Sequence, residues 1–313
     1  QIGGDVGHAR RAAELAKCDL VTEMVLEFPE LQGIMGRYYA EHDGEPADVA
    51  QALEEQYLPR FAADAIPHSR TGLALALADR LDTLTGIFGI GQRPTGTKDP
   101  FALRRAAIGV LNILVKGELN LDLRELLELA AAQHQELPYA ETLVDEVLGY
   151  MLDRFRAWGQ DEGISAEAYL AVRARPVTRP LDFARRLRAV QAFAGREEAA
   201  ALAAANKRVS NILAKQEGEV GSQVDAGVLH EAAEQALHEA VSARREQVMP
   251  LFAAGRYAEA LDTLAGLREP VDAFFDQVMV MADDPATRTN RLALLASLRA
   301  LFLEVADIAQ LQQ

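Results

Sequence analysis

The chain has 313 residues, of which 50% are hydrophobic and 25% are charged. This length predicts about two domains, and this composition is typical of globular proteins, which excludes a disordered or fibrous chain. No apolar run approaches the roughly 18 residues that cross a bilayer. The 32 Lys and Arg against 47 Asp and Glu give a net charge of −15, which for the chain as a whole disfavours nucleic acid and anionic membranes as partners.

Helical patterns follow one another along almost the whole chain, and no strand-type alternation competes with them. Between residues 8 and 28, apolar or small side chains recur at steps of three and four, which predicts one amphipathic helix. Further helices are predicted over residues 47–58, 69–88, 101–115, 121–132, 140–158, 181–193, 197–213, 228–248, 257–267, 270–281 and 286–308. The sequence therefore predicts an all-α protein.

Prolines mark three of these helix starts, because a proline at the first helical position loses no hydrogen bond. The three pairs are Asp99-Pro100, Glu269-Pro270 and Asp284-Pro285. Residues 134–138 interrupt two helical patterns and predict a boundary between domains 1–140 and 141–313. A second break, residues 216–227, contains three glycines and is interpreted as a loop inside the second domain.

The single cysteine, Cys18, cannot form an internal disulfide, which favours a reducing cytoplasmic location. It lies in the predicted helix 8–28 without an evident His and Asn partner set, so we expect a buried structural thiol and no catalytic nucleophile. The first residue is Gln1, not Met, and we expect the sequence to be a piece of a longer chain.

Metal-ligating residues are arranged poorly for the helical hydrolases that bind metal through an adjacent His-Asp pair. Cys18 and Asp19 occupy the place where such a pair is wanted, and the literal pair His42-Asp43 lies in a turn-like sequence. The potential partners are His8, His68, Asp79 and Asp82. We expect no metal site, and we expect these carboxylates to cap helices or to pair with Arg80 and neighbouring bases.

A glycine-rich segment over residues 86–105 resembles a phosphate-binding loop but lacks two of its parts. Thr97 separates Gly96 from Lys98, and no buried strand precedes the segment. Lys98, Arg104 and Arg105 can still contact phosphate near a helix start. The alternative is a rigid turn between helices that is capped by Asp99.

The charge is distributed unevenly, with twelve Lys or Arg against six Asp or Glu between residues 154 and 215. Within this basic segment, one predicted helix carries a run of residues suited to RNA, namely Asn206, Lys207, Arg208, Asn211 and Lys215. The start of the last predicted helix adds Arg288, Asn290 and Arg291. Arg and Asn suit phosphates and base edges respectively. Two interpretations remain open, a binding face for RNA and an ordinary solvated surface with paired charges.

Four stretches carry a resemblance to a known family: AKCDLVTEMVLEFPELQGIMGRYYA, LADRLDTLTGIFGIGQRPTGTKDPFALRRAAIGVL, AAANKRVSNIL and LREPVDAFFDQVMVMADDPATRTNRLALLASLRALF. In this order they closely resemble the β subunit of the bacterial two-subunit glycyl-tRNA synthetase. The resemblance covers nearly the whole chain. It implies an HD-type helical domain, degenerate in its metal-binding pair, followed by a helical anticodon-binding domain similar to that of arginyl-tRNA synthetase.

The same resemblance implies a function. The α subunit of that family carries the active site, where ATP and Mg²⁺ serve the aminoacylation, and the β subunit supplies most of the tRNA binding. We therefore expect a tRNA-binding fragment with tRNA(Gly) and the α subunit as partners, without cofactor, membrane or DNA partner, and without catalysis of its own. The competing interpretations are a metal-dependent HD-type phosphohydrolase and a helical protein-interaction scaffold, the latter because residues 255–267 look like half of a tetratricopeptide unit.

Overall fold

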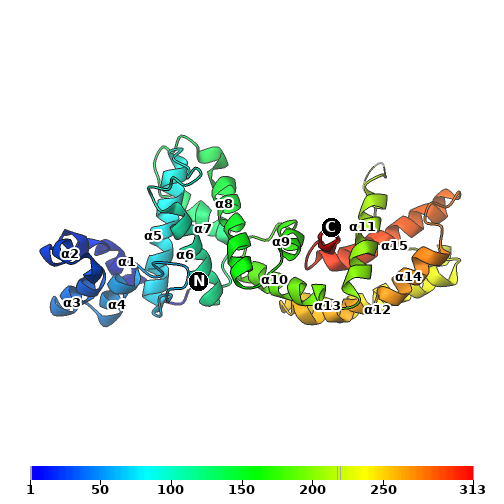
Figure 1. Ribbon diagram of the computed structural model, residues 1–313, viewed down its shortest axis with the longest axis horizontal. Coiled ribbons are helices and arrows are strands. Elements are labelled where there is room, and N and C mark those ends of the chain that lie inside the picture. The colour runs from blue at the N-terminus through cyan, green and yellow to red at the C-terminus, as the bar shows by residue number, and fades with distance from the viewer. Residues whose placement is uncertain (1, 217, 219, 313) are drawn as a thin grey trace. The chain divides into compact units, whose positions relative to one another are not determined.

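The computed structural model describes residues 2–216, 218 and 220–312. In these residues the regular structure consists of fifteen α-helices and four short 3-10 turns (Figure 1). An isolated bridge between Thr95 and Lys98 is the one β-type pairing within the same residues. The expectation of an all-α protein is therefore confirmed. In this described part, no helix is both long and apolar enough to cross a membrane.

The chain forms two compact units. The first comprises Gln1–Ala157 and Thr178–Leu181, and the second comprises Trp158–Val177 and Asp182–Gln313. The boundary expected at residue 140 falls on the first residue of helix α8 (Ala140–Asp161), and the change of unit lies further along that helix. The short return segment joins the first unit because Thr178 accepts a backbone hydrogen bond from Leu123, at 2.9 Å.

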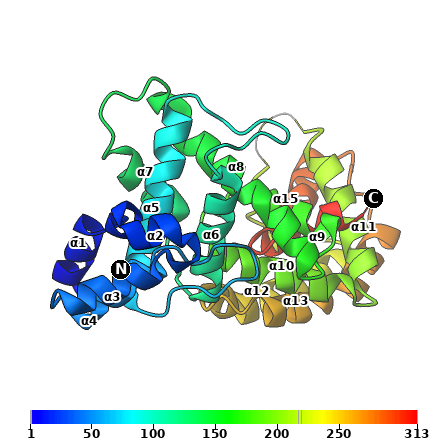
Figure 2. The ribbon, with the colours of Figure 1, turned by 60° about the vertical axis from the view of Figure 1, so that its left-hand side comes forward.

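The first unit is built around the long helix α5, which packs against α1, α4, α6 and α7. Figure 2 shows α5 and α6 side by side. The core of the first unit contains fully buried side chains from α5, α6 and α7, namely Leu84, Ile113, Leu114, Leu123 and Leu127. The helices are α1 (Val6–Glu14), α2 (Glu23–Glu27), α3 (Ile34–His42), α4 (Ala47–Glu55), α5 (Arg70–Gly89), α6 (Leu103–Lys116), α7 (Leu123–Ala131) and most of α8.

The predicted helix over residues 8–28 is wrong. Helix α1 ends at Glu14, and Lys17 has a left-handed backbone with φ of 65°, which a continuous α-helix cannot contain. A 3-10 turn (Cys18–Val21) and the short α2 follow. This break brings the Asp19 carboxylate inside the unit and leaves Cys18 exposed, so the expectation of a buried thiol is also wrong.

The second unit contains α9 (Ala166–Arg173), α10 (Pro180–Ala194), α11 (Ala199–Leu213), α12 (Ala232–Ala253), α13 (Tyr257–Ala265), α14 (Arg268–Gln277) and α15 (Pro285–Leu303). Residues 290–295 of α15 are all buried, which places this helix in the middle of the unit. Phe183, Phe193, Phe274 and Phe302 are its largest fully buried side chains.

Of the three helix starts that prolines marked in the sequence, one is correct. Asp284 caps α15 through Thr287 N at 2.8 Å, and Pro285 is its first residue. Helix α6 begins at Leu103, after Pro100, and α14 begins at Arg268, before Pro270. The expected loop 216–227 joins α11 to α12 within the second unit, although residues 217 and 219 lie outside the described residues.

Candidate nucleic-acid interface

Helix α11 presents most of its predicted RNA-binding residues to solvent. Val209 and Leu202 are buried, and Lys207, Arg208, Asn211 and Lys215 are exposed. Asn206 lies on the inner side, where its amide group donates to the Leu202 carbonyl at 3.0 Å. Because Asn206 is only 1% exposed, direct contact with RNA does not fit its position.

Lys207 and Arg208 make different contacts although they are neighbours in sequence. The Lys207 ammonium donates to the carbonyl of Gln312, at 3.1 Å. The Arg208 guanidinium lies over the ring of Phe275 in α14, with 4.2 Å from its central carbon to the ring centroid. This cation–π contact orients a flat cation at the surface while leaving it accessible.

A hollow of about 570 Å³ lies beside Arg208 and Ile212. Residues 276–281, which lead out of α14, form the rest of its lining. Met279 and Met281 in this segment are 74% and 49% exposed. Sequence reasoning missed these methionines and Phe275. Two methionines alternating with valines directly before an acidic helix start were the available signal.

The start of α15 contributes less accessible surface than the sequence suggested. Arg288 is partly exposed and donates to the Ala282 carbonyl, at 3.2 Å. Asn290 is 7% exposed and pairs with the backbone of Asp225, donating to its carbonyl at 2.9 Å and accepting from its amide at 2.8 Å. Its polar groups therefore connect α15 to the loop between α11 and α12.

Arg291 is also enclosed, with 7% of its surface exposed. Its guanidinium pairs with the buried carboxylate of Glu234 and donates to the Met279 carbonyl, at 2.7 Å. Its ion-pair partners are thus Glu234 and Glu231, not the acidic residues Asp283 and Asp284 that precede it in the sequence. Direct base contact by Asn290 or Arg291 does not fit their burial, because α15 is surrounded by other helices at these positions.

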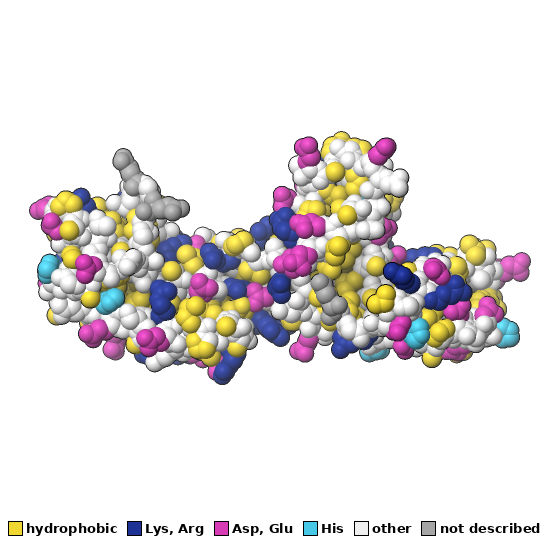
Figure 3. Space-filling view, turned by 180° about the vertical axis from the view of Figure 1, so that it is seen from behind, with side chains coloured by type: hydrophobic (Ala, Val, Ile, Leu, Met, Phe, Trp, Pro, Cys, Tyr) yellow, Lys and Arg dark blue, Asp and Glu magenta, His cyan; other side chains and the backbone are white. Residues whose placement is uncertain are grey.

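Several cations of the basic segment 154–215 are paired with carboxylates. Arg186 pairs with Asp182 at 2.7 Å, and Arg196 pairs with Asp262 at the same distance. On the face that Figure 3 shows, dark blue and magenta side chains are interspersed. Asp182 already enters the count of six carboxylates, whereas Asp262 lies outside the segment and offsets one further positive charge.

The glycine-rich segment forms a capped turn. The Asp99 carboxylate accepts from the amides of Leu103 and Arg104, both at 2.9 Å, and so occupies the place where a phosphate would bind at the start of α6. Arg104 donates to the Gly96 carbonyl. Lys98 and Arg105 are exposed. The segment thus agrees with the turn interpretation, and only these two side chains point to an outside partner.

Asp19 has a structural role in the first unit. One of its oxygens accepts from the Gly33 amide at 2.7 Å, and the other accepts from the Tyr57 hydroxyl at 2.8 Å. Burial, together with the neighbouring Asp19 carboxylate, raises the pKa of Tyr57, which keeps it a donor. Lys17 pairs with Asp79 at 3.0 Å. Among the described residues, no three His, Cys, Asp or Glu gather as a metal site would require.

Arg80 does not pair with these carboxylates, contrary to expectation. It is 8% exposed and donates to backbone carbonyls of four residues, namely Gln56, Tyr57, Pro59 and Ala76. Burial lowers the pKa of Arg80. Asp82 lies 3.4 Å from the His134 ring instead. The polar residues of this region therefore hold helices and loops together.

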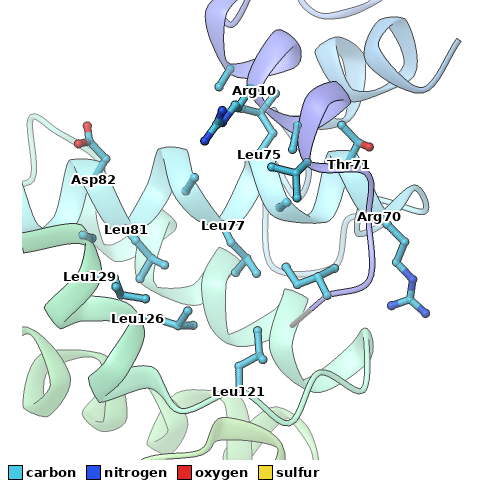
Figure 4. Close-up of a pocket in the computed structure, with 18 of the residues that line it drawn as sticks. Arg10, Arg70, Thr71, Leu75, Leu77, Leu81, Asp82, Leu121, Leu126 and Leu129 are labelled. Atoms are coloured by element: carbon cyan, nitrogen blue, oxygen red, sulfur yellow. The ribbon is translucent and has the colours of Figure 1, made fainter. Parts of the chain in front are cut away.

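An apolar groove of about 720 Å³ lies between α1, α5 and α7. Figure 4 shows Leu77 and Leu81 of α5 facing Leu126 and Leu129 of α7. None of the residues proposed for RNA contact lines this groove. Its apolar lining does not suit a phosphate backbone.

Comparison with known proteins gives two family matches. The family described as "Glycyl-tRNA synthetase beta subunit" matches residues 1–174. The family described as "DALR anticodon binding domain" matches residues 202–309, which include α11, α14, α15 and the hollow.

Individual relatives agree with these matches. Proteins named glycine–tRNA ligase beta subunit are 76% identical in Chromohalobacter salexigens over 313 residues, 59% in Marinobacter nauticus over 311 residues, and 58% in Pectobacterium carotovorum over 312 residues. The matches cover 99–100% of this chain but 45–46% of the relatives. The chain therefore spans about half the length of these curated relatives.

Proposed function

The chain belongs to the family of glycyl-tRNA synthetase β subunits, and on this premise we propose that it binds tRNA(Gly) and positions it for ATP-dependent aminoacylation at the α-subunit site. Its contribution to the reaction is geometric. Phosphate contacts fix the register of the tRNA, and a few base contacts select it.

One observation carries this proposal. The exposed residues Lys207, Arg208 and Asn211 lie on α11, and the exposed Lys215 follows its end, all inside the region that matches an anticodon-binding domain. Cations gathered on a rigid helix bind phosphates by releasing counterions, even when the whole chain is acidic. Arg288, Lys98 and Arg105 are proposed as further phosphate contacts, whereas Asn206, Asn290, Arg291 and Arg104 are assigned to holding the structure.

The remaining parts of the proposal follow from the family. We propose the α subunit as protein partner, a cytoplasmic location, and no role for DNA or membranes. ATP and Mg²⁺ belong to the α-subunit site. The first 140 residues serve as a degenerate HD-type scaffold, in which Asp19 anchors a loop.

A binding titration tests the proposal. The chain is titrated with tRNA(Gly) and with a non-cognate tRNA at several salt concentrations. We expect tighter binding of tRNA(Gly) and a linear fall of log K with log salt concentration. Equal binding of both tRNAs, or no salt-dependent binding, would contradict it. Elemental and phosphatase assays on the same sample address the phosphohydrolase alternative, for which we expect neither stoichiometric metal nor activity.

A further inference from the structure

We propose that the hollow between α11 and residues 276–281 seats one unpaired base of the bound RNA, a base that carries an exocyclic amino group. This inference rests on the proposed function and assigns it a specific site. The residues that line the hollow are Arg208, Ile212, Asp276, Gln277, Val278, Met279, Val280 and Met281.

The segment 278–281 has an alternating pattern that creates this site. Val278 and Val280 are 6% and 7% exposed, and Met279 and Met281 are 74% and 49% exposed. Val278 has an extended backbone, with φ of −110° and ψ of 124°, and the alternation of buried and exposed residues continues through the bend at Val280 and Met281. The valines therefore anchor the segment in the core, while the methionines stand at the surface.

Arg291 and Phe274 hold this segment in place from inside the unit. The Arg291 guanidinium binds the Met279 carbonyl at 2.7 Å, and Glu234 fixes that guanidinium in turn. The Val278 amide donates to the Phe274 carbonyl at 2.9 Å. The two exposed methionines are consequently displayed on a backbone tied at both ends, which suits a preformed binding surface.

The exposed side chains of the hollow offer the two kinds of contact that an unstacked base needs. Methionine is polarisable and packs well against flat rings, and the planar Arg208 cation, held on Phe275, offers a second stacking surface and a phosphate contact. The hollow, of about 570 Å³, is open to solvent, so a base splayed out of a loop can reach it.

Asp276 and Gln277 supply the contacts to the base edge. Both are exposed at the rim of the hollow. A carboxylate accepts hydrogen bonds and repels acceptors, so Asp276 favours a base with an exocyclic amino group over uracil. An apolar protein side chain in the hollow would make no polar contact with Arg208 or Asp276, whereas an RNA base and its phosphate could contact both. RNA is therefore the favoured occupant.

A double-mutant cycle tests the site. The 313-residue chain and its Met279→Ala/Met281→Ala variant are titrated with tRNA(Gly) and with transcripts made abasic at one anticodon-loop position at a time. We expect the variant to bind intact tRNA about tenfold more weakly. At one abasic position we expect this difference to fall below about twofold, because the base that used the methionines is already missing. The matched control is Met249→Ala, since Met249 of α12 is 47% exposed and lies outside the hollow.

The outcomes separate this inference from the function on which it rests. If the double variant weakens every transcript by the same factor, or weakens none, the hollow does not seat a base, while salt-dependent binding by the unmodified chain still supports the proposed function. If the unmodified chain does not bind tRNA(Gly), both proposals fail.

A second measurement concerns Asp276. Where the abasic series identifies a position, its base is replaced by uracil. We expect the unmodified chain to bind this transcript about tenfold more weakly and the Asp276→Ala variant to bind both transcripts alike. If the Asp276→Ala variant still binds the uracil transcript about tenfold more weakly than intact tRNA(Gly), Asp276 does not select the base.

Discussion

The Arg291 guanidinium and the Glu234 carboxylate form an ion pair in which the Glu234 side chain is completely buried and the Arg291 side chain is 9% exposed. The second Glu234 oxygen accepts from the amides of His230 and Glu231, at 2.9 and 3.0 Å. One carboxylate thus caps the start of α12 and fixes the arginine of α15 that holds Met279.

Arg291→Ala should destabilise the chain by about 3–5 kcal/mol, because it leaves the Glu234 charge buried without its partner. Urea unfolding monitored by circular dichroism measures this change. Adding Glu234→Gln to Arg291→Ala should recover part of the loss, since the neutral amide oxygen still caps α12. A loss below about 1 kcal/mol for Arg291→Ala would mean that the pair is not enclosed in solution.

Glu234 should also contribute to acid sensitivity. Although burial acts to raise the pKa of Glu234, hydrogen bonds from the Glu231 amide and from Arg291 bring it below the ordinary value of 4.5. A depressed folded pKa gives stability that is complete above pH 4.5 and lost as the pH falls through the folded value. The stability gap between the unmodified chain and Glu234→Gln should therefore narrow on acidification. Glu239→Gln, at an exposed position of α12, is the control and should change stability by less than about 0.5 kcal/mol.

Arg208→Ala should weaken binding of all tRNAs and lower the slope of log K against log salt concentration by about one, if Arg208 makes one phosphate contact. Lys207→Ala should have the same effect, although Lys207 must exchange its bond to Gln312 for a phosphate. Arg256→Ala is the matched control, because Arg256 is exposed and paired with Glu259. A slope that falls equally in the control would show a general charge effect.

Tyr57→Phe should destabilise the chain by about 1–3 kcal/mol, because one oxygen of the buried Asp19 loses its donor. Tyr38→Phe, at a 51% exposed side chain, should change stability by less than about 0.5 kcal/mol. Thermal unfolding of the two variants gives the comparison. Similar stability of both would argue against an anchoring role for Asp19.

The chain alone should not charge tRNA with glycine, and addition of the α subunit alone should not restore full activity. Both expectations follow from assigning the active site to the α subunit and from the chain covering 46% of a full-length relative. A charging assay with labelled glycine measures this directly. Glycyl-tRNA formed by the chain alone would require a catalytic site that we have not assigned.

Local patterns were sufficient to predict much of the helical framework. The sequence correctly singled out Lys207, Arg208 and Asn211 of α11 as candidate surface contacts, whereas Asn206 of the same run is buried. The Asp284-Pro285 pair correctly marked the start of α15. Helix α9, with eight residues, was not predicted, although α4, α7 and α13, with nine residues each, were.

Local periodicity and specific motifs were enough to predict the all-helical class, the family and the exposure of Lys207, Arg208 and Asn211 on α11. Packing between helices buries Asn290 and Arg291, turns Asp19 inward and leaves Met279 and Met281 exposed. No local pattern predicted these positions. Periodicity identifies residues that share a helix face, but burial depends on what packs against each face. Residues 290–295 of α15 are buried, and the polar residues Asn290 and Arg291 therefore form their hydrogen bonds inside the protein.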